Sequence, residues 1–221
     1  LVGAAIPLNE GCLKPLEIVI PEGSLLDPKP PAAVVAGNVE TSQLVVDALF
    51  AATGRMANAQ GTMNNFTFGN ARYQYYETIC GGSGAGVDAE GHGFAGTSAI
   101  HTHMTNSRMT DPEVLERRFP VRLVWHRVRP GSGGDGAFPG GDGASRKLVF
   151  LDAMEAALLS SRRNEAPTGL KEGGSALSGQ QWKVHANGQR EALPSLFSVS
   201  VEPGDAIEIE TPGGGGYGKS E

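Results

Sequence analysis

Glycine is the residue that most restricts the folds open to this chain. The 221 residues include 32 glycines, about 14%, which is twice the usual share of about 7%. Two glycine-rich stretches, 81–96 and 130–143, show no sustained helical or strand periodicity. Glycine weakens the interior of helices and strands, so we expect these stretches to be long loops between short regular elements.

Helical periodicity is convincing in one long segment and one short one. Residues 41–56 are predicted to form a helix, capped by Thr41 or Ser42. Its buried face is predicted to carry Leu44, Val45, Ala48, Leu49 and Ala52. A second, short helix is predicted from Asp111-Pro112 to about Arg118, because aspartate caps helices and proline suits the first helical position.

The rest of the chain is predicted to consist of strands and turns. The predicted strands are 16–20, 66–68, 72–79, 99–104, 121–128, 147–151, 157–160, 181–186, 196–201 and 206–210. This pattern indicates a β-rich α+β fold with mixed or antiparallel sheets, with a sandwich or barrel as an option for the C-terminal third. We expect two regions: 1–143, a central α+β region whose glycine loops face a substrate, and 144–221, a C-terminal β-rich region.

Composition excludes several classes of partner. The formal net charge is −6, and binding to nucleic acid or to an anionic membrane surface needs a basic face. No stretch approaches the roughly 18 apolar residues of a membrane-spanning helix. Two cysteines are too few for a disulfide scaffold. We therefore expect a cytoplasmic protein. Because the sequence opens at Leu1 without methionine, we also expect it to be a fragment or a processed product.

Two glycine motifs resemble phosphate-binding loops but lack the required context. Residues 213–220 read GGGGYGKS, which matches the P-loop pattern, yet that loop must lead directly into a helix. Only Glu221 follows it. The segments 131–136 and 91–96 match G-x-G-x-x-G, but neither is followed by a helical pattern. The sequence therefore predicts no nucleotide site in this chain.

Polar residues beside the first glycine stretch are candidates for chemistry. His101 and His103 would share one face of a strand and could reach one metal ion, or they could line a pocket. Glu77 follows aromatic residues and is a candidate general base, with an exposed strand residue as the alternative. Asn64 and Asn106 can both donate and accept hydrogen bonds, which suits a cyclic amide.

Cys80, Gly81 and Gly82 come directly after the predicted strand 72–79. Cys80 is a candidate nucleophile, although nothing local predicts a lowered thiol pKa, so a small buried residue is favoured. The glycines allow a ligand to approach the backbone closely.

These segments, in this order, resemble the hydantoinase B/oxoprolinase family, specifically the C-terminal portion of its large subunit. The resemblance covers essentially the whole chain. It includes YETICGG at 76–82, HTHMTN at 101–106 and ETPGGGGYG at 210–218. The other segments that carry it are 6–12, 21–26, 30–41, 60–65, 129–134 and 140–143. Each is weak alone, and nine in register are specific.

The resemblance implies a cytoplasmic, ATP-dependent hydrolase that opens hydantoins, 5-oxoproline or related lactams, as in N-methylhydantoinase. A hydantoinase A-type partner subunit would bind ATP and Mg²⁺ and phosphorylate the amide oxygen. The B subunit would then direct water at the activated carbonyl of a small cyclic amide. The implied hetero-oligomer includes the remaining N-terminal part of the B subunit, which would hold a divalent metal.

Within this chain, the resemblance implies a substrate cavity and no metal ligands. We predict catalytic roles for Glu77, His101 and His103 and substrate binding by Asn64, Asn106, Gly81 and Gly82. Two alternatives remain: a non-catalytic assembly module of such a complex, or a subunit of a related ATP-dependent ketone carboxylase.

Overall fold

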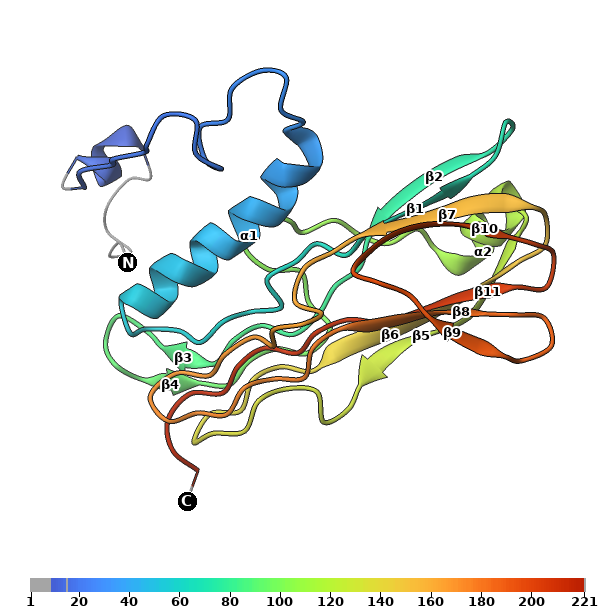
Figure 1. The fold of residues 1–221 in the computed structure, drawn as a ribbon. Helices are drawn as coiled ribbons and strands as arrows, with labels where there is room; N and C mark the ends of the chain where they lie inside the picture. The colour runs from blue at the N-terminus through green and yellow to red at the C-terminus, as the bar shows by residue number, and fades with distance from the viewer. Residues whose placement is uncertain (1–8, 15, 221) are drawn as a thin grey trace.

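Two antiparallel sheets face each other in the computed structural model, which describes residues 9–14 and 16–220 (Figure 1). The four-stranded sheet contains, in spatial order, β10 (Leu196–Val201), β7 (Met154–Leu159), β1 (Asn65–Gly69) and β2 (Gln74–Thr78). The five-stranded sheet contains β5 (Val121–Arg129), β6 (Gly143–Phe150), β11 (Ala206–Glu210), β8 (Gln180–Val184) and β9 (Arg190–Ala192).

The hydrophobic core lies between these two sheets. Alternate residues of each strand point inward, and Phe68 of β1 meets Phe150 of β6 edge to face, with ring centroids 5.5 Å apart. Leu158 and Ile207 join the same buried cluster from the two sheets. The β-rich α+β class with antiparallel sheets is thus confirmed.

Strands from both predicted regions combine in each sheet. The first sheet joins β1 and β2 to β7 and β10, and the second joins β5 to the later strands. No sheet in the described part of the chain closes into a barrel. A sandwich confined to the C-terminal third therefore stays unconfirmed, and the division at residue 143 stays a prediction about organisation.

Extended glycine-rich segments form a second layer of structure beside the sheets. We call this layer the glycine bundle, made of residues 57–60, 81–85, 96–100, 132–142, 168–177 and 212–218. Backbone hydrogen bonds join residues 81–85 to four other segments, at 57–60, 97–100, 141 and 212–215. A β-strand has at most two such neighbours, so the bundle is not a sheet, although its backbone groups are largely paired.

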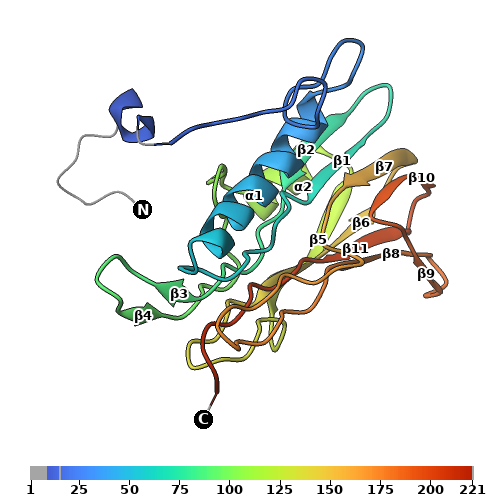
Figure 2. The ribbon, with the colours of Figure 1, turned by 60° about the vertical axis from the view of Figure 1, so that its left-hand side comes forward.

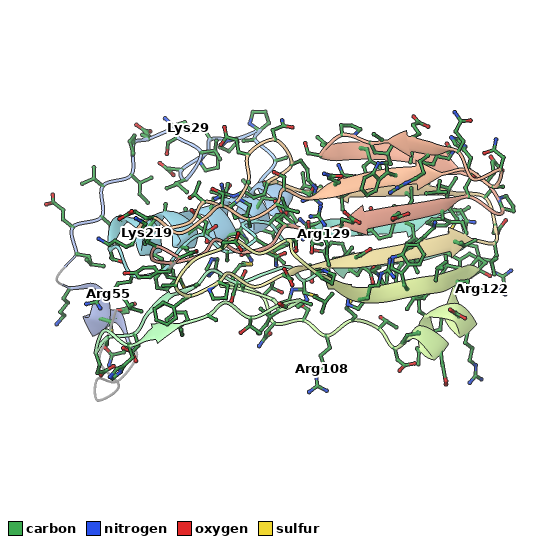
Figure 3. The ribbon with its side chains drawn as sticks, turned by 90° about the horizontal axis from the view of Figure 1, so that it is seen from below. Lys29, Arg55, Arg108, Arg122, Arg129 and Lys219 are labelled. Atoms are coloured by element: carbon green, nitrogen blue, oxygen red, sulfur yellow. The ribbon has the colours of Figure 1, made fainter. Side chains whose placement is uncertain are left out.

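Close approach of these backbones explains the glycine content. A Cβ on Gly82 would lie 1.9 Å from the carbonyl oxygen of Gly141, and one on Gly140 would lie 1.9 Å from that of Gly214. Arg129 lies where this bundle meets the five-stranded sheet (Figure 3). Its guanidinium pairs with Glu210 and donates to the carbonyl oxygens of Ser178 and Thr211, the residues next to two bundle segments. The predicted loops are therefore a packed structural core.

Helix α1 (Val35–Ala52) lies along the glycine bundle (Figure 1). It begins six residues before the predicted start, and Val34 at its N-cap makes no side-chain cap hydrogen bond. The predicted buried face is wrong, because Leu44, Ala48, Leu49 and Ala52 are exposed.

The buried face of α1 is polar instead. Glu40, Gln43 and Asp47 are at most 8% exposed. Glu40 accepts from the backbone N–H of Met63 and Asp47 from that of Ala59. Backbone groups at the bundle's edge need hydrogen-bond partners, and the helix supplies them.

Most of the other element predictions are confirmed. Helix α2 (Pro112–Arg118) is capped by Asp111, whose carboxylate accepts from the N–H of Glu113. The predicted strands at 16–20 and 99–104 are wrong, because neither segment belongs to a sheet. The remaining short elements are η1 (Glu10–Leu13), β3 (Gly86–Val87) and β4 (Gly93–Phe94).

Candidate functional site

A surface pocket of about 430 Å³ lies where the glycine bundle meets the five-stranded sheet. Its walls come from three places: Cys80, which follows Ile79 after the end of β2, the segment 99–109, and the edge strand β5. The lining residues are Cys80, Ala99, Ile100, His101, Asn106, Ser107, Met109 and His126. The pocket therefore unites two of the predicted site residues, His101 and Asn106, with Cys80 and a second histidine.

The pocket keeps its titratable groups neutral. Burial lowers the pKa of His101, and burial, Arg146 and His101 together lower the pKa of His126 to about 4. Burial raises the pKa of the Cys80 thiol. Near pH 7, both imidazoles are thus neutral, and each has a nitrogen able to accept a proton. The Nδ1 atom of His101 is buried without a hydrogen-bond partner.

Glu77 lies behind the pocket and does not line it. The Nε of Arg146 donates to one of its carboxylate oxygens at 2.7 Å, and Nη2 donates to the other at 3.0 Å. Tyr75 also donates to Glu77 at 3.0 Å, and burial and the Glu77 charge raise the pKa of Tyr75 to about 12. With both oxygens engaged, this geometry favours a positioning role for Glu77. Its catalytic role stays a prediction.

His103 is directed away from His101. Its Nε2 lies 2.8 Å from the carboxylate of Asp47 on α1, and its ring stacks on Phe50. Ala99 and His103 have φ values of 48° and 59°, a left-handed backbone conformation that interrupts an extended strand. The expectation that both imidazoles share one strand face is therefore wrong.

Asn64 is fully buried inside the protein. Its amide donates to the carbonyl oxygen of Ile79 and to Gln60, while its oxygen accepts from Arg163 at 2.8 Å. Burial lowers the pKa of Arg163 to about 9. Asn64 thus holds a partly buried guanidinium, and direct contact with a substrate stays a prediction.

Gly81 and Gly82 lie within the glycine bundle. A Cβ on Gly81 would meet the side chain of Gln60 at 2.1 Å, and one on Gly82 would meet Gly141. The close approach they permit is thus made by the chain itself. Their role in substrate binding stays a prediction.

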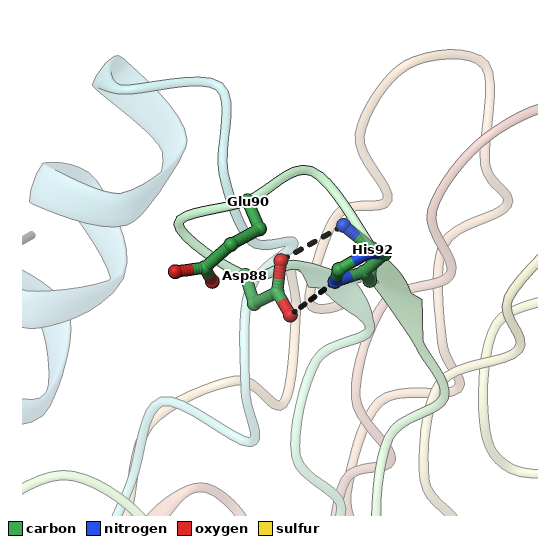
Figure 4. A group of neighbouring side chains, drawn as sticks. All are labelled: Asp88, Glu90 and His92. Atoms are coloured by element: carbon green, nitrogen blue, oxygen red, sulfur yellow. Dashed lines mark hydrogen bonds and ion pairs between the residues drawn. The ribbon is translucent and has the colours of Figure 1, made fainter.

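Metal-ligating side chains converge at one place among the described residues, and it is not the pocket. Among residues 9–14 and 16–220, only Asp88, Glu90 and His92 bring three candidate donor atoms within 4.8 Å of one another (Figure 4). All three are exposed, and His92 already pairs with Asp88 at 3.2 Å. The donor atoms of Cys80, His101 and His126 in the pocket do not come this close together.

The P-loop match at 213–220 has a different structure from a phosphate site. Residues 213–216 are buried in the glycine bundle, where a Cβ on Gly214 would lie 1.9 Å from the carbonyl oxygen of Ser83. No helix follows within the described residues up to 220.

His126 was not predicted as a site residue because the alternation of β5 places it with Arg122 on the wet face. A register shift between Leu123 and Trp125 reverses this order. His126 consequently pairs across the strands with buried Arg146, whereas Trp125 faces outward beneath Lys147. The sequence contains no clear signal for this bulge.

Fold and pocket together define an α+β protein with facing antiparallel sheets, a glycine bundle and a cavity of neutral histidines. The family model described as hydantoinase B/oxoprolinase matches residues 1–220. The chain therefore belongs to the hydantoinase B/oxoprolinase family.

Comparisons with individual proteins agree. The 5-oxoprolinase of Dictyostelium discoideum is 47% identical over 221 residues, covering 100% of this chain and 17% of the relative. An ATP-dependent caprolactamase from Pseudomonas jessenii has a similar fold, with a TM-score of 0.71 and 22% identity over 91% of this chain and 38% of that one. A nucleotide-free acetone carboxylase has a TM-score of 0.56 and 17% identity, over 74% and 26% of the two chains.

The chain thus spans about a sixth of the length of the 5-oxoprolinase that it matches. None of the helices in the described residues is both long and apolar enough to cross a membrane.

Proposed function

We propose that this chain is the hydrolytic part of an ATP-dependent amidohydrolase of the hydantoinase/5-oxoprolinase type, which opens the ring of a small lactam or imide. The observation that carries the proposal is the match of the whole chain, at 47% identity, to a 5-oxoprolinase. The fold shared with a caprolactamase supports a cyclic amide as the substrate class.

The activation step belongs to another part of the assembly. A hydantoinase A-type domain or subunit binds ATP and Mg²⁺ and phosphorylates the amide oxygen, which converts a poor electrophile into a reactive imidate. Water then adds to the carbon, the ring C–N bond breaks as nitrogen takes a proton, and a second water releases phosphate. Residues 1–221 contribute to the water-addition step, in which orientation and proton transfer set the rate.

His101 is the residue we assign to proton transfer. Its imidazole is neutral near pH 7 because burial lowers its pKa, so it can accept a proton from water and return it to the ring nitrogen. Asn106 lines the same pocket and can bind the amide group of the substrate through its own amide. Glu77 fixes Arg146 beside His126 and acts as a positioning residue.

The remaining roles concern the larger assembly. Catalysis by His103 and substrate binding by Asn64, Gly81 and Gly82 belong to the same proposal, and they require the cavity of the larger assembly because none of these residues lines the pocket. A divalent metal is held by the N-terminal part of the B subunit, and no ligand comes from this chain. The assembly is a cytoplasmic hetero-oligomer like N-methylhydantoinase.

A chimaera tests the assignment of His101. The 221 residues replace their counterpart in the Dictyostelium 5-oxoprolinase, and 5-oxoproline-dependent release of glutamate and ADP is measured. His101→Asn should lower kcat by about 10²-fold, the usual contribution of a general base. His185→Asn, the same change at a partly exposed histidine after β8, is the matched control and should leave kcat unchanged. If the His101→Asn chimaera turned over as fast as the His185→Asn control, the proposed role of His101 would be refuted. Full turnover by a correctly assembled His101→Asn chimaera would favour the alternative, a non-catalytic assembly module.

Ketone carboxylation is a second candidate, favoured by the fold shared with acetone carboxylase. Ketone carboxylation could use the same activation step, in which an oxygen of the substrate is phosphorylated. The chimaera distinguishes the two, because carboxylation makes ATP hydrolysis depend on bicarbonate and a ketone, whereas ring opening depends on the lactam alone.

A further inference from the structure

The outer face of α1 is apolar although the helix packs on the protein. Leu44 and Leu49 are 37% and 55% exposed, and Val35 is 81% exposed, whereas Asp47 and Gln43 are buried. Helices on a protein surface normally turn their apolar side inward. Here the polar side is committed to the glycine bundle, so the apolar side has no cover within the described residues.

The segment that precedes α1 adds to this surface. Residues 16–34 lie outside the body formed by the sheets and the bundle, with the helix between them and the rest (Figure 2). Its large apolar side chains are 45–80% exposed: Leu16, Ile18, Val19, Ile20, Leu25, Leu26 and Val34. Half of the exposed large apolar side chains in the described part of the chain, ten of twenty, lie within residues 16–49.

Two grooves indent the same surface. One, of about 580 Å³, lies between Leu25–Pro28 and the helix residues Thr41, Val45 and Val46. The other, of about 500 Å³, lies between Val35 and Val39 and the outer face of the four-stranded sheet, where Leu196 is 65% exposed. Their walls are mostly apolar, so they suit apolar side chains of another polypeptide segment.

We define the apolar flank as residues 16–34, the outer face of α1 (Val35, Leu44, Leu49) and Leu196. Soluble proteins rarely leave a contiguous apolar patch of this kind uncovered. We propose that the apolar flank is covered by the region of the full-length hydantoinase B/oxoprolinase polypeptide that lies outside the 221 matched residues. This proposal rests on the family membership and is independent of the chemistry proposed for the His101 pocket.

The length of that region argues for this occupant over a second copy of the chain. The 221 residues make up only 17% of the Dictyostelium 5-oxoprolinase and 38% of the caprolactamase chain. In those relatives, the remaining polypeptide is tethered to the matching region. A tethered segment acts at an effective concentration of about millimolar, which a separate copy does not reach in solution.

Cysteine accessibility tests the proposal directly. Leu49→Cys is introduced into the 221-residue chain and into the chimaera with the Dictyostelium 5-oxoprolinase. Labelling with a maleimide is followed by mass spectrometry of the peptide that carries position 49. Leu177→Cys, at a side chain that is 51% exposed but lies on the glycine bundle, is the matched control.

Position 49 should react rapidly in the 221-residue chain and at least about tenfold more slowly in the chimaera, as buried sites do. The control should react equally in both proteins. Equal reactivity of position 49 in the two proteins would overturn the proposal. Protection in the 221-residue chain, together with a dimeric mass by light scattering, would overturn it in favour of a second copy. Loss of activity by His101→Asn would leave this result unchanged.

Discussion

Arg146 holds Glu77 through two N–H···O hydrogen bonds, of 2.7 and 3.0 Å, at a place where both side chains are at most 4% exposed. The pair joins the first sheet to the second, since Glu77 lies on β2 and Arg146 on β6. It also keeps a positive charge beside His126. The ion pair therefore connects the core to the pocket.

Glu77→Gln should destabilise the fold by about 3–5 kcal/mol, because it leaves the buried guanidinium without its counter-charge. The free energy of unfolding, measured by urea denaturation, checks this. Glu22→Gln is the matched control, since the Glu22–Lys29 pair is 77% and 61% exposed and exposed pairs contribute about 0–1 kcal/mol. Equal losses for the two variants would contradict the expectation.

Gly82→Ala should prevent stable folding or cost more than about 3 kcal/mol, the upper end for overpacking. The new Cβ would lie 1.9 Å from the carbonyl oxygen of Gly141 and 2.5 Å from the backbone nitrogen of Gly214. Both atoms belong to the backbone and cannot rotate away as a side chain could. Gly37→Ala is the control, because no atom lies within 4 Å of its Cβ position on α1. It should gain about 0.5–1 kcal/mol from helix propensity. Thermal unfolding of the two variants separates these outcomes.

Regular elements were predictable where local periodicity and burial agree. β10 and β11 lie at the predicted residues, and α2 begins at the predicted cap. The glycine bundle was not predictable, because its segments bond to several neighbours at once and no period of 2 or 3.6 results. The glycine content predicted segments without regular helix or strand structure. A packed bundle and an open loop are equally rich in glycine, so the sequence does not distinguish them.

The site was predictable in part for a similar reason. His101 and Asn106 both line the pocket, whereas left-handed backbone at Ala99 and His103 separates the histidines. Short polar motifs do not reveal such backbone, and they do not reveal the bulge that places His126 across from Arg146. The orientation of α1 was missed because its apolar face has no cover among the residues described here.

Asp47→Ala should cost about 2–4 kcal/mol, since it leaves the N–H of Ala59 and the ring of His103 without their buried acceptor. Hydrogen exchange should show the effect first in the amides of α1, which Asp47 anchors to the bundle. Ser42→Ala on the same helix is the control, because Ser42 only donates to the carbonyl oxygen of Val39 one turn earlier. If the amides of α1 exchanged at the same rate in the Asp47→Ala and Ser42→Ala variants, that result would argue against an anchoring role of Asp47.

Acid should weaken the fold through His126. In the unfolded chain, a histidine titrates near a pKa of about 6.5, whereas burial, Arg146 and His101 lower the pKa of folded His126 to about 4. Between these values, the unfolded state binds a proton that the folded state refuses, so the stabilising contribution is complete above pH 6.5 and is lost as the pH falls toward 4.

The size of this loss is limited by solvent. His126 is an exposed residue, and solvent screens its charge, so we expect about 1 kcal/mol between pH 7 and pH 4.5. Urea denaturation at the two pH values gives the difference for the natural chain and for His126→Asn, which cannot titrate in this range. The asparagine variant should lose correspondingly less stability on acidification. If both proteins lose the same amount, the proton is taken up elsewhere, and His101, whose pKa burial also lowers, is the next residue to replace.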